Sequence, residues 1–106
     1  MATSREYLAF MLDQLSGLDG ITHRGMMGEY LLYYRGRIAA CLCDDRLLVK
    51  PVPAALRLLP GARREPPYEG AKEMLLVENV DDREFLRALF EAMYEELPLP
   101  KPKKKK

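Results

Sequence analysis

The residues best suited to chemistry are few, and the clearest of them is a pair of cysteines. Cys41 and Cys43 are separated by one residue in a segment that alternates like a strand, so both side chains point to one face. This spacing is not the C-x-x-C of redox enzymes or zinc knuckles, and it is tight for a disulfide. We therefore expect buried, unreactive thiols in a reducing compartment.

A catalytic or metal centre built on histidine is not predicted, because His23 is the single histidine of the chain. A zinc site needs three or four ligands, which His23 with Glu29 or a cysteine would not supply. Paired acids have local explanations as turn, cap and helix-end residues; the pairs are Asp44-Asp45, Asp81-Asp82 and Glu95-Glu96. We predict no enzymatic activity, no metal and no cofactor.

Basic residues are candidates for binding. The C-terminal tail carries five lysines, Lys101, Lys103, Lys104, Lys105 and Lys106. Without them, the chain has 12 basic against 16 acidic side chains. Such a tail attracts nucleic-acid phosphates without reading sequence, or serves only to keep the chain in solution. Other basic residues near turns form either a basic rim or a salt-bridged surface; they are Arg24, Arg35, Arg37, Arg46 and Lys50.

The elements that must position these residues follow from apolar periodicity. Helices are predicted over residues 4–16, capped by Thr3, and after Asp81, where the same capping pattern recurs. Strands are predicted over residues 21–26, 29–34, 37–43, 46–50 and 72–78. Hairpin turns are expected at Arg35-Gly36 and Asp44-Asp45, and a short helix over 54–59 and a loop over 61–70 precede the last strand.

This order, α-β-β-β-β-α-β-α, predicts an α+β fold. We expect a two-layer sandwich in which a roughly five-stranded antiparallel sheet carries the N- and C-terminal helices on one face. Within residues 37–43, alternation places Ile38, Ala40 and Leu42 on one side and Ala39 with both cysteines on the other. The stretch from residue 29 to 34 adds three tyrosines, typical of half-buried strands and also of partner surfaces.

The chain length is that of one domain, and we assign it to residues 1–98, followed by a disordered Pro/Lys tail over 99–106. Apolar runs do not approach the roughly 18 residues of a membrane span, and acidic and basic residues interrupt the N-terminal apolar stretch. We therefore expect a cytoplasmic protein that does not associate with membranes.

Several short motifs carry a family resemblance. They are Arg24 followed by Met26-Met27-Gly28, the hairpin at Gly36, Asp45-Arg46-Leu47 leading to Lys50, and Tyr68-Glu69-Gly70. With them, the chain from its first helix to Pro98 resembles the TfoX N-terminal domain family, named for a bacterial regulator of competence genes. The resemblance implies an α+β domain with an antiparallel sheet, a regulatory or protein-interaction role and no known enzymatic activity. The founding regulator has a second, helical domain where this chain has a lysine tail, so a role in competence is not transferred.

The candidate interaction surface is drawn from these motifs and the tyrosine-rich segment: Arg24, Met26, Met27, Glu29, Tyr30, Tyr68 and Glu69. We expect a non-enzymatic regulatory or interaction module, with transcription as one process it could serve. It would dock a partner protein, or a second copy, on an exposed sheet edge or on the 61–70 loop. The alternatives are a nucleic-acid accessory protein that uses the lysine tail and a small-molecule binder with a pocket between sheet and helices.

Overall fold

The computed structural model describes residues 3–26, 28–67 and 70–97, with the backbone alone at Met26. Its elements, in chain order, are α1 (Arg5–Gln14), β1 (Ile21–Met26), β2 (Glu29–Tyr34), β3 (Arg37–Cys43), β4 (Arg46–Val49), α2 (Pro53–Leu58), β5 (Arg64–Glu65), β6 (Met74–Val77), α3 (Arg83–Met93) and the 3-10 turn η1 (Tyr94–Glu96). None of the helices in these ranges has the length and apolar composition of a membrane span.

The strands form one antiparallel sheet in the order β1-β2-β3-β4-β6-β5, which confirms the predicted α+β fold. The sheet has six strands rather than roughly five. The additional strand, β5, lies inside the predicted loop over 61–70 and pairs Arg64 with Leu75 and Glu65 with Met74. Two residues are too short to show alternation, so only the neighbouring β6 reveals this strand.

Two hairpin turns explain why the middle strands are antiparallel neighbours. Arg35 and Gly36 have φ values of 53° and 84°, and Asp44 and Asp45 have φ values of 54° and 56°. Positive φ at both central residues is typical of the type I′ turn, whose twist matches that of the flanking strands. Both predicted turns are confirmed, and the second is made without glycine.

Both major helices begin one residue later than the capping patterns predict. Ser4, not Thr3, caps α1 by accepting a hydrogen bond from the Tyr7 amide. Thr3 is buried and its hydroxyl instead accepts from the Asp45 amide. At α3 the cap is Asp82, the neighbour of the predicted Asp81, and its carboxylate accepts from Phe85.

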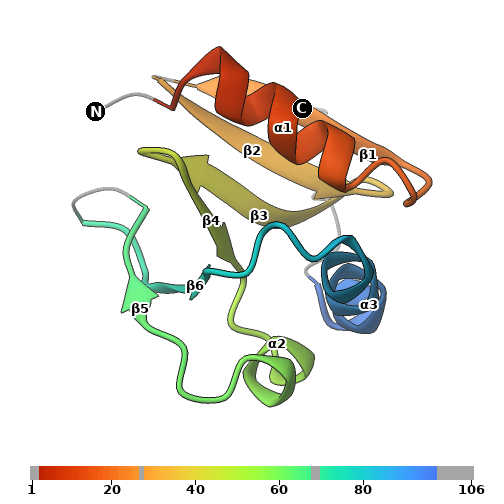
Figure 1. Ribbon diagram of the computed structural model, residues 1–106. Helices are drawn as coiled ribbons and strands as arrows, with labels where there is room; N and C mark the ends of the chain where they lie inside the picture. The colour runs from red at the N-terminus through yellow and green to blue at the C-terminus, as the bar shows by residue number, and fades with distance from the viewer. Residues whose placement is uncertain (1–2, 27, 68–69, 98–106) are drawn as a thin grey trace, which may run out of the picture.

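One face of the sheet, the helix face, carries the main core. Its strand residues include Leu32, Leu42, Leu47, Val49, Leu75 and Val77. They pack against Met11 and Leu15 of the α1 segment, the alanines of α2, and Phe90 with its neighbours on α3. Figure 1 shows α1 lying across β1 and β2, with α2 and α3 packed beside each other. The prediction that both terminal helices cover one face is confirmed.

The opposite face, the thiol face, has a smaller cluster formed by Leu31, Cys41, Cys43, Leu48, Met74 and Leu76. A bulge on β3 shifts its alternation, because Leu32 pairs with Ala40 while Tyr33 pairs with Ile38. Ala39 is the extra residue and joins the helix-face core. Ile38 then shares the thiol face with Tyr33, so the predicted sides of Ile38 and Ala39 are wrong.

Candidate functional site

The strand β1 forms the longer of the two edges of the described sheet. Among the described strands, β1 pairs with β2 alone, over six residues from Ile21 to Met26. The Arg35 amide donates to the Gly20 carbonyl, so these two residues form a hydrogen-bonded pair. This pair shows which residues of β1 bond to β2 and which do not. Because antiparallel residues alternate between inward and outward backbone groups, Ile21, His23 and Gly25 direct their N–H and C=O groups away from β2. This edge offers three donor and acceptor pairs to an added strand.

The described members of the candidate interaction surface divide between the two faces of the sheet. Arg24 pairs with Leu31 and is exposed, and Glu29 shares the face of Leu31 by alternation. Tyr30 instead packs against the helix-face core. The Met26 side chain, Met27, Tyr68 and Glu69 lie outside the described residues, as do the lysines of the tail, Lys101, Lys103, Lys104, Lys105 and Lys106.

His23 lies in the middle of the exposed β1 edge. It pairs with Leu32, and its ring meets Tyr30 edge-on with the ring centroids 6.1 Å apart. These contacts place His23 on the helix side of the hairpin, away from both cysteines. Its exposed ring and outward backbone make it part of the β1 edge.

The two cysteines form the most unusual contact in the structure. Both are free, and their Sγ atoms lie 2.7 Å apart, although Cys41 is 3% exposed and Cys43 is 1% exposed. The hydrogen bond between them lowers the pKa of Cys41 and raises the pKa of Cys43. Burial opposes ionisation of both groups. The sequence prediction of buried thiols is confirmed, and their reactivity stays a prediction.

Glu29 lies beside these thiols rather than beside His23. One ligand atom from each of Glu29, Cys41 and Cys43 falls within 4.8 Å of the others. Thiolate and carboxylate are zinc ligands, and this set would leave a fourth position open. The sulfur atoms are too close for that geometry, because two thiolates on one tetrahedral zinc lie roughly 3.8 Å apart, given Zn–S bonds of about 2.3 Å. The sequence alone did not group Glu29 with both cysteines, because that grouping depends on strand pairing.

A cavity of about 520 Å³ opens on the thiol face next to Cys41. Its lining is mainly apolar, from Leu31, Ile38, Met74, Pro51, Pro67 and Ala71, with Lys50, Lys72 and Glu73 among the charged lining residues. One alternative from the sequence was a small-molecule pocket between the sheet and the helices. This cavity lies instead between the opposite face and the segment that follows β5.

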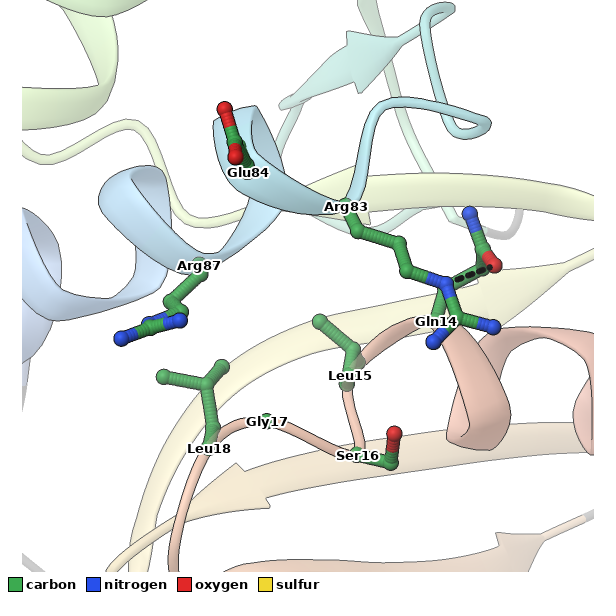
Figure 2. A pocket seen from close by; sticks show the side chains of 8 residues that line it. All are labelled: Gln14, Leu15, Ser16, Gly17, Leu18, Arg83, Glu84 and Arg87. Atoms are coloured by element: carbon green, nitrogen blue, oxygen red, sulfur yellow. Dashed lines mark hydrogen bonds between the residues drawn. The ribbon is translucent and has the colours of Figure 1, made fainter.

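A smaller cleft of about 210 Å³ lies where the end of α1 meets the start of α3. In Figure 2, Gln14 and Arg83 point toward each other across this cleft, joined by a hydrogen bond of 3.0 Å. The Gln14 amide also donates to the Val80 carbonyl, and Arg83 pairs with Asp13 at 2.6 Å. The polar groups on this side are used to hold the two helices together.

Several of the basic residues considered for a rim are engaged in local contacts. Arg46 pairs with Glu65 and donates to the Cys43 carbonyl. Arg37 donates to the Tyr94 carbonyl and lies over the Tyr94 ring, and Arg35 lies over the same ring. Arg35 and Arg37 fasten the sheet to η1, and Arg46 links β4 to β5 through the one ion pair that these three arginines form within the described residues.

Comparisons with known proteins agree with this architecture. The family model described as TfoX N-terminal domain matches residues 13–96. A curated relative from Spirochaeta aurantia, described as an uncharacterized 12.7 kDa protein in trpE 5'region, is 34% identical over 107 residues. The match covers 100% of this chain and 93% of the relative, and no solved structure matches the chain significantly. On these grounds, the chain belongs to the TfoX N-terminal domain family.

Proposed function

We propose that this chain is a non-enzymatic regulatory module that docks a partner protein along the outer edge of β1. The observation that carries the proposal is the open six-residue edge, with the backbone groups of Ile21, His23 and Gly25 directed outward. An extended segment of a partner would add a seventh strand there, as in other cases of strand addition.

Side-chain exposure on β1 supports an extended partner with acidic residues. Thr22, His23, Arg24 and Gly25 are all exposed. Arg24 offers a cation beside the docking strand, and Gly25 leaves room for a close approach of the partner backbone. Among the described residues, no acidic side chain forms an ion pair with Arg24, so an acidic side chain on the incoming strand would be complementary.

The proposal includes a cytoplasmic location and the absence of catalysis. Two free cysteines 2.7 Å apart support a reducing compartment. The absence of catalysis is supported by the acid pair at the β3–β4 turn. Its Asp45 makes a structural contact, because it accepts a hydrogen bond from the Ser4 amide. Cell fractionation and activity assays test these two points directly.

The docking experiment compares His23→Pro with His23→Ala in the full chain. Proline removes an outward N–H without removing a ladder bond to β2, whereas alanine removes the imidazole and keeps the N–H. We expect His23→Pro to lose partners that co-purify from the native cells with the unmodified chain, and His23→Ala to retain them. Losing about one backbone hydrogen bond to the partner, with weakening of the bonds next to it, should lower the affinity of His23→Pro for the partner about tenfold.

Thermal unfolding of both variants controls for misfolding. Identical partner sets for the proline variant and the unmodified chain would argue against strand addition at β1. A chain that forms only dimers by light scattering, with dimers lost in His23→Pro, would identify a second copy as the occupant.

The lysine tail supports a second candidate function, nucleic-acid association. The five lysines named above follow Pro98 with no acid among them. If they neutralise about five phosphates, log K falls with log salt at a slope of about −4. Truncation after Pro98 should abolish retention on DNA and RNA; unchanged retention would dismiss the tail.

A further inference from the structure

The thiol pair on β3 has no part in docking at β1, and its geometry calls for an explanation. Cys41 and Cys43 lie on the same face, opposite Leu48 and Arg46 respectively. Their sulfur atoms are 2.7 Å apart, well inside ordinary non-bonded contact for two atoms of this size. A disulfide bond is about 2.05 Å long, so bond formation requires the atoms to approach by well under 1 Å. Binding one tetrahedral zinc would require them to separate by about 1 Å.

The strand must bend locally for the bond to form, because a disulfide needs Cβ atoms within about 4.5 Å of each other and side chains two apart on a straight strand are farther apart. Residues two apart in a strand have Cα atoms about 6.6 Å apart. Disulfides are found with Cα separations up to about 6.8 Å, so this bond lies near the upper limit. A disulfide at the limit of its geometry is more easily reduced than an ordinary structural one. The pair would therefore stay reduced in a reducing compartment and oxidise when disulfides accumulate.

Access to the pair is one-sided. Cys41 lines the cavity of about 520 Å³ on the thiol face, whereas Cys43 is not among its lining residues. Cys43 is 1% exposed, a Glu29 carboxylate oxygen lies within 4.8 Å of its Sγ atom, and its carbonyl accepts a hydrogen bond from Arg46. A small molecule in the cavity reaches Cys41 first.

We propose that Cys41 and Cys43 form a dithiol site that small disulfides, entering the thiol-face cavity, oxidise to an intrachain disulfide. Cys41 is the attacking residue and Cys43 the resolving residue. The hydrogen bond with Cys43 lowers the pKa of Cys41, and the Arg46 and Lys50 cations act in the same direction, while burial and Glu29 oppose them.

The exchange takes place in two balanced steps. The Cys41 thiolate attacks one sulfur of a disulfide RSSR, forming a mixed disulfide and releasing RS⁻. Cys43 then loses its proton and attacks the Cys41 sulfur, which forms the Cys41–Cys43 bond and releases the second RS⁻. The two thiolates take up the protons of the two cysteines. The protein dithiol is oxidised by two electrons, and RSSR is reduced to two RSH.

The test uses the reduced full chain and 2-hydroxyethyl disulfide, a small neutral probe. We expect native protein to lose two hydrogen atoms in intact mass and both titratable thiols, and to regain them with reductant. Cys43→Ser should accumulate a mixed disulfide at Cys41, because the resolving thiol is missing. Cys41→Ser should react many times more slowly, because Cys43 does not reach the cavity.

Two comparisons examine the route through the cavity. Ala71→Trp should slow the reaction several-fold by filling space beside Cys41, whereas Ala88→Trp on the exposed side of α3 should not. Oxidised glutathione, which is larger, should react more slowly than the small probe.

The following outcomes would overturn the proposal. Thiols of the unmodified chain that react only under denaturing conditions would show that the pair is closed to disulfides. Equal adduct formation by both serine variants would remove the assigned roles. A chain purified with a metal ion bound by both cysteines, and resistant to oxidation until chelated, would identify a metal site with Glu29. Since the unmodified chain gives the first and third results, misfolding of a variant does not affect them.

Discussion

Leu47 and Leu48 are neighbours on β4, both with 0% exposure, yet they are buried in different surroundings. Leu47 lies in the large core between the sheet and the helices α1, α2 and α3. Leu48 lies in the small thiol-face cluster with Cys41, Cys43 and Met74. No described helix packs in that second cluster, and a cavity opens beside it.

This difference should decide what a substitution on each face changes. The helix face follows the rule for two-layer folds, in which one sheet face is sealed by amphipathic helices. The thiol face keeps space, polarisable sulfur and charged neighbours, which a purely structural face would not need. We expect substitutions on the helix face to change mainly stability and those on the thiol face to change reactivity.

The matched pair Leu47→Ala and Leu48→Ala should give the largest contrast. Buried leucine truncation costs about 2 to 5 kcal/mol, depending on how far the site can collapse. We expect about 4 kcal/mol at Leu47, where packed helices hold the cavity open, and about 2 kcal/mol at Leu48, where the cluster is small and can relax. Urea unfolding measures both values. Equal losses would mean that the two faces are equally rigid.

The sequence predicted the helix face better than the thiol face, and the reasons are physical. Periodicity over many residues identified the helix after Asp81, because every turn repeats the signal, and α3 indeed buries Leu86, Leu89, Phe90 and Met93. The β3 bulge was missed, since both Ile38 and Ala39 are apolar and a one-residue shift leaves the composition unchanged. The grouping of Glu29 with the cysteines depends on register between strands, which no local pattern records.

The capping residues show the same limit on a smaller scale. Thr3 and Ser4 can both cap a helix, as can Asp81 and Asp82, so local chemistry allows two starts. Tertiary contacts distinguish them at α1, where Thr3 is held by the Asp45 amide. Docking was anticipated on an exposed sheet edge or on the 61–70 loop, whereas the position of β1 at an edge and the faces taken by Arg24 and Tyr30 followed only from the pairing.

Gln14 tests whether polar groups stabilise the helix face as well as apolar ones. Gln14→Ala leaves the Val80 carbonyl and the Arg83 Nε without this partner at a site where Gln14 is only 9% exposed. A buried group left unsatisfied costs about 1 to 3 kcal/mol, and we expect about 2 in chemical unfolding. Asp13→Ala removes the neighbouring exposed pair with Arg83 and should cost under about 0.5 kcal/mol. Similar losses for both would mean that the amide contributes no more than a surface charge.

Asp45 links the start of α1 to the β3–β4 turn. Its carboxylate accepts from the Ser4 amide at 2.9 Å, and its own φ of 56° is better tolerated by Asp or Asn than by Ala. We expect Asp45→Ala to cost about 1 to 2 kcal/mol through the lost bond and the disfavoured backbone. Asp45→Asn keeps an acceptor and the turn preference, so its thermal midpoint should stay close to that of the unmodified chain. A large loss in the Asn variant would point to charge instead.

A small effect is also expected for the ion pair of Arg46 and Glu65 at the border of the thiol face. Both side chains are partly exposed, 32% and 24%, so a double-mutant cycle should give a coupling of about 0.5 to 1 kcal/mol. Loss of this ion pair should loosen the structure only locally, because Glu65 belongs to β5. Next to β5, the Leu76 amide donates a hydrogen bond to the Arg63 carbonyl. Hydrogen exchange at Leu76 should accelerate in Arg46→Ala and Glu65→Ala, while exchange in α3 follows only the small global change. Uniform acceleration at both places would mean that β5 unfolds only with the whole domain, and that the thiol face is held as firmly as the helix face.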